Sequence, residues 1–135
     1  MRVRVYIAGP YTLGHVGKNV HKAMEMWHTL KDLGYSPLCP HLTHFLGIHK
    51  FRPIDEWYEY DLDWLEVCHI LLRMPGESMG SDREVEIAKE LNIPVVYTVS
   101  ELLDVFPPDK LEEEDEWEEE EENVYDPESY EWIED

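Results

Sequence analysis

The sequence is poor in basic residues and in cysteine, and it has no long apolar run. Its 135 residues include 11 Lys and Arg against 31 Asp and Glu. Phosphate contacts require clustered Lys and Arg, so a duplex nucleic-acid partner is not expected. No window approaches the roughly 20 apolar residues that cross a bilayer, so a membrane partner is not expected either. Two cysteines, Cys39 and Cys68, without an apolar signal region predict reduced thiols in a cytoplasmic protein.

The acidic excess is concentrated in the last part of the chain. Residues 109–135 hold sixteen Asp and Glu against one Lys, whereas residues 1–108 hold 15 acidic and 10 basic residues. Like charges at this density, including the run Glu118–Glu122, resist compaction and favour a flexible tail. Aromatic residues within it leave open that it docks on a partner or on the rest of the chain. We therefore expect one domain over residues 1–108 and an acidic tail over residues 109–135.

Apolar patterning over the first 108 residues predicts strands that alternate with helices. Strands are expected over residues 3–8, 35–39, 67–74 and 94–99, and helices over residues 16–33, 53–65, 82–91 and 101–105. Residues 41–51 show no clean period and are expected to form a loop. The alternation predicts an α/β fold, namely a doubly wound, flavodoxin- or Rossmann-like parallel sheet of four to five strands in a single domain.

In such a sheet, ligands bind at the carboxyl ends of the strands where the strand order reverses. If the second strand lies outside the first and the third lies on its other side, the reversal falls between strands one and three. The loops at residues 9–17 and 75–81 then border the site. Small residues in the second loop would let backbone N–H groups approach an anion at the start of the following helix. That loop is a candidate phosphate or hydroxyl cradle.

Glu84 has two interpretations. Ser81 and Glu84 match the capping box, in which the glutamate returns a hydrogen bond to the N-cap backbone, and the residues alone favour this interpretation. The alternative is a carboxylate nucleophile, because the helix dipole keeps a first-turn carboxylate ionised and directed at the cleft.

Asp61 also has two interpretations. Its spacing from Tyr58 and Leu65 places it on the inward stripe of the second helix, where an unpaired carboxylate is costly. It is either a site residue or a structural carboxylate bonded to a nearby loop backbone. Burial would raise its pKa and partners would lower it, and the sequence leaves both directions open.

Other candidates carry weaker signals. Tyr6, at the end of the first strand, and Tyr11, in the loop after it, are interpreted from the residues alone as packing side chains. A possible metal cluster lacks a fourth ligand with convincing spacing, so no metal is expected; its members are Cys39, His41, His44 and His49. Three basic residues near the ligand edge could offset substrate charge: His15, Lys18 and Arg52.

Three segments resemble the nucleoside 2-deoxyribosyltransferase superfamily, which includes nucleoside 5'-monophosphate N-glycosidases. They are Tyr6–Tyr11, Tyr60–Leu65 and Ser78–Glu84 followed by Ala88, within about residues 3–99. The resemblance implies that Glu84 is the nucleophile, that Asp61 assists departure of the base and that Tyr6 orients the nucleophile. The substrate-binding residues expected from these segments are Gly9, Pro10, Tyr11, Ser78, Gly80 and Ser81.

The resemblance also implies a substrate class. Ser78 stands where the transferases have an aspartate that holds the sugar hydroxyl, and the resembling nucleotide hydrolases use a serine there to receive a 5'-phosphate. Cleavage of the N-glycosidic bond of a (deoxy)nucleoside 5'-monophosphate or nucleoside is therefore expected, with release or transfer of the base. A homo-oligomer without a cofactor is implied as well. Three aromatic residues are available to stack on a base, although aromatics in an amphipathic helix more often pack in the core: Trp57, Tyr58 and Trp64.

Two features depart from the family pattern, and two other functions stay open. His69 lies in the third strand where relatives often carry an acidic residue, and the acidic tail is no part of the usual domain. A non-catalytic nucleotide-binding sensor would bind ligand without turnover. A protein that acts through its acidic tail would bind a basic partner.

Overall fold

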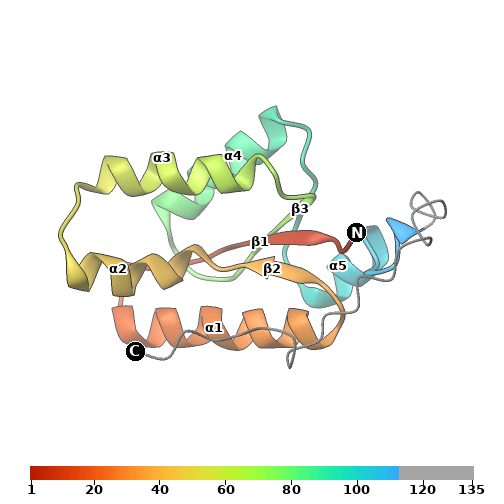
Figure 1. Cartoon of the computed structure of the whole chain (residues 1–135), viewed down its shortest axis with the longest axis horizontal. Coiled ribbons are helices and arrows are strands. Elements are labelled where there is room, and N and C mark those ends of the chain that lie inside the picture. The colour runs from red at the N-terminus through yellow and green to blue at the C-terminus, as the bar shows by residue number, and fades with distance from the viewer. Residues whose placement is uncertain (113–135) are drawn as a thin grey trace, which may run out of the picture.

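The computed structural model describes residues 1–112, which form a parallel sheet covered by helices on both faces (Figure 1). The strands are β1 (Arg4–Ala8), β2 (Ser36–Leu38), β3 (Ile70–Arg73) and β4 (Val95–Val96). Their order is β2-β1-β3-β4 and every neighbouring pair is parallel. The predicted doubly wound α/β fold is confirmed, with four strands and with the reversal between β1 and β3.

The two central strands are apolar along their whole length because both of their faces are covered. On β1, Val5 and Ile7 belong to the core cluster on one face, whereas Tyr6 and Ala8 belong to the cluster on the other. The first core receives side chains from α1 (Val16–Asp32) and α5 (Val99–Val105). The second receives them from α3 (Ile54–Leu65) and α4 (Met79–Glu90). Figure 1 shows the same division for three of these helices, with α1 below the sheet and α3 and α4 above it.

The prediction of a loop over residues 41–51 is wrong. The segment forms a short 3-10 turn, η1 (Pro40–Leu42), and a seven-residue helix, α2 (Thr43–His49). None of the residues of α2 is buried, so the helix has no core-facing apolar stripe for a periodicity to reveal. It packs mainly on η1 and closes one side of a pocket instead.

Other boundaries differ by a few residues. Helix α4 begins at Met79 rather than near Asp82, and β4 has two residues where six were expected. Both cysteines are buried free thiols, and burial raises the pKa of each to about 11. Within residues 1–112 no helix is long and apolar enough to cross a bilayer. Residues 113–135, which make up most of the predicted acidic tail, lie outside the described residues, so the domain boundary at residue 108 stays a prediction.

Candidate active site

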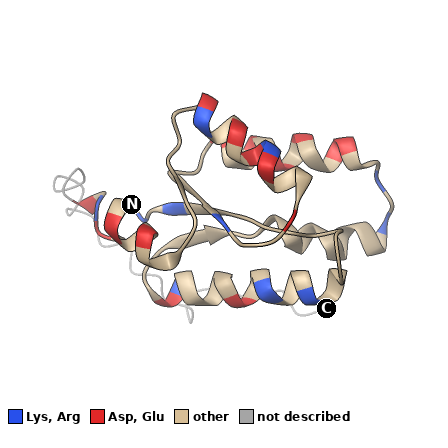
Figure 2. Ribbon diagram, turned by 180° about the vertical axis from the view of Figure 1, so that it is seen from behind, with Lys and Arg blue, Asp and Glu red and all other residues tan. Residues whose placement is uncertain are grey.

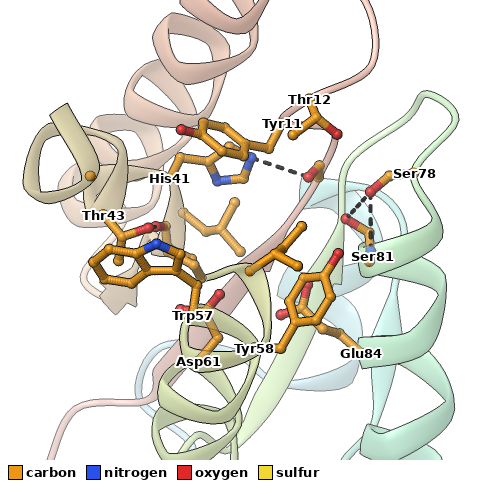
Figure 3. Close-up of a pocket in the computed structure, with 16 residues that line it drawn as sticks. Tyr11, Thr12, His41, Thr43, Trp57, Tyr58, Asp61, Ser78, Ser81 and Glu84 are labelled. Atoms are coloured by element: carbon orange, nitrogen blue, oxygen red, sulfur yellow. Dashed lines mark hydrogen bonds between the residues drawn. The ribbon is translucent and has the colours of Figure 1, made fainter. Parts of the chain in front are cut away.

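A pocket of about 140 Å³ lies at the carboxyl ends of β1 and β3, at the predicted reversal of strand order. Its walls come from four places: β1 with the loop after it, η1 with α2, the inner side of α3, and the start of α4. Figure 3 shows side chains from these elements converging on one space. Its lining includes the two carboxylates singled out in the sequence, Glu84 and Asp61.

Glu84 projects from α4 into the pocket, where the hydroxyl of Tyr6 donates a hydrogen bond to its carboxylate. Burial raises the pKa of Glu84 to about 7. The Tyr6 hydrogen bond and the positive charge of Arg73 act in the opposite direction, since both favour the ionised form. The carboxylate is thus partly buried and held by a neutral donor.

The capping-box interpretation of Glu84 is wrong. The N-cap of α4 is Ser78, whose hydroxyl oxygen accepts from the Ser81 backbone N–H at 3.1 Å. Glu84 therefore lies in the second turn of the helix, too far along to reach the N-cap backbone. Because Glu84 lies beyond the first turn, the helix dipole stabilises its ionised carboxylate only weakly.

Asp61 faces Glu84 across the pocket from α3. Burial raises the pKa of Asp61 to about 7, and the negative charge of Glu84 adds to the effect. Within residues 1–112 its carboxylate accepts no hydrogen bond from a loop backbone, so the structural alternative is not what the fold shows. An inward carboxylate without a partner is a costly feature that a purely structural role does not explain.

The two carboxyl groups share one pocket, so the ionisation of one affects the other. Their negative charges repel each other, which disfavours the doubly ionised state. Only Glu84 has a hydrogen-bond donor and a nearby cation that favour its ionised form. These partners favour ionisation at Glu84, and the negative charge of Glu84 in turn raises the pKa of Asp61.

Tyr6 is fully buried on β1 and supplies the donor beneath Glu84. Burial, followed by the charges of Glu84 and Asp61, raises the pKa of Tyr6 far above its usual range. Its hydroxyl therefore stays protonated and serves as a fixed hydrogen-bond donor. Strand alternation positions it, because Tyr6 faces the side of the sheet that α3 and α4 cover.

The loop between β3 and α4 contributes a possible anion cradle. Besides capping the helix, Ser78 donates to the Ser81 hydroxyl at 3.0 Å, and both serines line the pocket with Gly80 (Figure 3). The first amide groups of α4 have no partners within the helix and point toward its beginning. A Cβ at Gly80 would lie 3.6 Å from the Tyr58 ring, so glycine keeps this space open.

Aromatic and imidazole side chains also line the pocket. Trp57 and Tyr58 of α3 line it, and the Tyr11 hydroxyl lies 2.7 Å from Nδ1 of His44, which joins the loop after β1 to α2. Buried His41 directs Nε2 at the carbonyl oxygens of Gly9 and Pro10, at 3.2 and 3.0 Å. Burial lowers the pKa of His41, so the neutral ring donates to these carbonyl groups.

His41 and His44, which belong to the possible metal cluster, have other hydrogen-bond partners. Sγ of Cys39 lies 3.9 Å from Nδ1 of His41, whose other nitrogen faces backbone carbonyl oxygens. His44 is engaged with Tyr11. In the part of the chain that the structure describes, no group of three or more His, Cys, Asp or Glu side chains is placed to hold a metal ion.

Several predicted binding residues lie elsewhere. Pro10 lines a neighbouring cavity of about 360 Å³, which shares Gly9 and His41 with the pocket. Trp64 is 45% exposed and does not line the pocket. Three basic residues are also absent from its lining: His15, which caps α1, Lys18, and Arg52, which pairs with Glu56.

Sequence reasoning missed the contributions of α2 and of the second cavity. Thr43 and Gly47 line the pocket from the segment that was predicted to be a loop, and Thr12 lines it from the loop after β1. Lys22, on α1, lines the second cavity. Thr43 and Gly47 gave no signal, because a helix without a buried face has no periodic pattern, whereas Thr12 lies within the loop that was predicted to border the site.

Comparison with known proteins gives a family and a fold. The model of a family described as "Domain of unknown function (DUF7768)" matches residues 3–98. No curated protein matches the sequence. Among solved structures, a 2-deoxyribosyltransferase from the psychrotolerant bacterium Bacillus psychrosaccharolyticus is similar, with a TM-score of 0.56, 18% identity and 69% of each chain covered. At this identity the likeness shows a shared fold.

Proposed function

The chain belongs to the DUF7768 family, and we propose that it cleaves the N-glycosidic bond of a nucleoside 5'-monophosphate or nucleoside with Glu84 as nucleophile. The observation that carries the proposal is the pair of carboxyl groups in one pocket, of which Glu84 accepts a hydrogen bond from Tyr6 and Asp61 has no hydrogen-bond partner among the described residues. One ionised nucleophile and one proton donor are what glycosidic cleavage with a covalent intermediate requires. The fold shared with a 2-deoxyribosyltransferase supports the assignment.

In the proposed reaction, the Glu84 carboxylate attacks the anomeric carbon of the sugar while the bond from that carbon to the base nitrogen breaks. Protonated Asp61 gives its proton to the departing base, which leaves as a neutral molecule. The sugar is then esterified to Glu84 and Asp61 is ionised. Water then attacks the anomeric carbon, the bond from that carbon to the Glu84 oxygen breaks, and the water gives a proton to Asp61, which regenerates the enzyme as a hydrolase. A second base in place of water would make it a transferase.

The binding roles follow from position in the pocket. Trp57 and Tyr58 offer faces on which a base can stack, next to the two carboxyl groups. Ser78, Gly80 and Ser81 stand at the start of α4, where a helix favours an anion, and we assign this place to the 5'-phosphate. We assign the sugar to the part of the pocket that Gly9 and Tyr11 line.

Chromatographic detection of free base tests the proposal. Purified protein is incubated with a panel of nucleosides and their 5'-monophosphates, with and without a second base, next to the Glu84→Gln variant. Base released only from monophosphates and only by wild type supports a nucleotide N-hydrolase. Release that needs a second base indicates a transferase. Binding without release from any substrate, or full release by Glu84→Gln, contradicts the proposed chemistry; the former points to a sensor.

A further inference from the structure

Arg73 is a buried charge at the end of an otherwise apolar strand. The other residues of β3 are Ile70, Leu71 and Leu72, and Arg73 is only 8% exposed. Taking a guanidinium out of water is costly unless its partners compensate. Its ion-pair partner Asp82 is 73% exposed, so solvent screens that pair and it adds little. Stability alone is a poor reason for an arginine at this position.

The guanidinium instead holds the loop between β3 and α4. Nη1 donates to the carbonyl oxygen of Met74, and Nη2 donates to the carbonyl oxygen of Gly76 at 2.8 Å and to Oδ1 of Asp82 at 3.1 Å. These acceptors lie at the beginning of the loop, at its turn and just inside α4. Ser78, the N-cap of α4, lies between the last two. One side chain therefore fixes where the start of α4 stands relative to the sheet.

The pocket also needs a positive charge that its own lining does not supply. The charged residues that line it are Asp61 and Glu84, and no Lys or Arg of residues 1–112 does so. The charge of Arg73 nevertheless reaches this space, since it lowers the pKa of Glu84. An anionic substrate that approaches two acidic groups is repelled unless a cation lies behind its binding loop.

We propose that Arg73 is a positioning residue that makes the β3–α4 loop selective for phosphorylated substrates, by holding Ser78 and the start of α4 in place and by supplying positive charge behind them. The inference rests on the proposed function, which assigns the phosphate to this loop. Lysine is a poor substitute, because a single ammonium group lacks the planar fork that reaches three separate acceptors.

Titration calorimetry in the Glu84→Gln background tests this without consuming ligand. The probes are the common ribo- and deoxyribonucleoside 5'-monophosphates and the matching nucleosides. Arg73→Met is expected to weaken monophosphate binding by about tenfold or more and to change nucleoside binding by less than about twofold. Arg73→Lys is expected to fall between. The control Arg52→Met removes an exposed arginine outside the pocket and should leave both affinities unchanged.

A purely structural role predicts a different result. Parallel weakening of both ligand classes, or unchanged selectivity in Arg73→Met, would overturn the inference, as would a wild-type preference for nucleosides. If Arg73→Met does not fold, as judged by circular dichroism, Arg73→Lys carries the test, and it must reduce the selectivity. Selective monophosphate binding without base release contradicts the proposed reaction alone. Base release with undiminished phosphate selectivity in the Arg73 variants contradicts this inference alone.

Discussion

At the scale of single residues, Tyr6 controls how readily Glu84 is ionised. Its hydroxyl donates to the carboxylate, and this bond opposes the effect of burial on the pKa of Glu84. Tyr6→Phe should therefore raise the pKa of Glu84 and move the acid limb of the kcat/KM profile to higher pH. We expect a loss of about tenfold or more in kcat/KM at pH 7. An unshifted acid limb in a pH-rate comparison with wild type would contradict this role.

Asp61 should affect both catalysis and stability. As proton donor Asp61 must be protonated, so kcat/KM should fall as pH rises through about 7. Asp61→Asn should abolish this fall at high pH. The same variant should reduce kcat by about 10²-fold or more. Its pKa in the folded chain, about 7, exceeds the ordinary value of 3.8. The folded state consequently binds the proton more tightly than the unfolded state, and stability is lost as pH rises from about 4 to about 7.

The stability effect of Asp61→Asn follows from this sign. An asparagine does not ionise, so the variant avoids the destabilisation that a buried charge causes in wild type at high pH. Its free energy of unfolding relative to wild type should therefore be higher at pH 8 than at pH 4, by on the order of 2 kcal/mol. Urea denaturation at the two pH values measures the difference. If the variant and wild type differ by the same free energy of unfolding at pH 4 and at pH 8, ionisation of Asp61 does not destabilise the fold.

Individual site residues were predictable from the sequence to different degrees. The inward position of Asp61 followed from helical spacing alone. Glu84 did not, since the capping pattern gave it an adequate structural explanation until the helix was seen to begin at Met79. The bond from Tyr6 to Glu84 joins residues 78 positions apart, and only the fold brings them together.

At the scale of elements, the turn between β3 and α4 depends on Gly76. Its φ of 115° is in the left-handed region, and an added Cβ would lie 2.7 Å from Cγ of Pro10. Gly76→Ala should lower the free energy of unfolding by about 2 to 4 kcal/mol, because it combines backbone strain with a clash. Gly14→Ala is the matched control, as Gly14 has a φ of 84° with open space around it and should cost only about 1 kcal/mol. Equal losses in thermal denaturation would show that the contact with Pro10 is unimportant.

Helices and strands with a buried face were predicted from the sequence, whereas α2, which has no buried residue, was not. α1, α3 and the central strands followed from periods that reflect burial against the sheet. α2 contributes no buried residue, so neither its existence nor its share of the pocket was visible in the sequence. An apolar period arises when one face of an element is buried, and a helix that only lines a pocket has no such period.

At the scale of the whole molecule, an exposed apolar surface surrounds α2. Its members are between 46% and 83% exposed: Leu42, Phe45, Leu46, Ile48, Phe51 and Ile54. Residues 33–49 contain no charged side chain, and Figure 2 shows α2 without Lys, Arg, Asp or Glu. In a chain of net charge -20, two copies that meet through this face bring few charged side chains together, so local repulsion is small there.

We therefore expect a homodimer that buries this surface. Sedimentation equilibrium should give twice the mass of the chain, 16.1 kDa. Phe45→Glu should shift the protein toward monomer by placing two carboxylates in the contact, whereas Leu103→Glu on α5, an exposed apolar position of the opposite helical layer, should not. A monomeric wild type, or equal dissociation by both variants, would contradict the assignment of this face.

The most direct test of the central claim is to look for the sugar on Glu84. Incubation with 2'-fluoro-2'-deoxyarabinosyl nucleosides and their 5'-monophosphates should slow the second step and let the covalent intermediate accumulate. Mass spectrometry of the digested protein should then show the added mass of the fluorinated sugar on the peptide that contains Glu84, and no addition in Glu84→Gln. Base release from ordinary substrates at the wild-type rate by Glu84→Gln, or an adduct on another residue, would contradict the account.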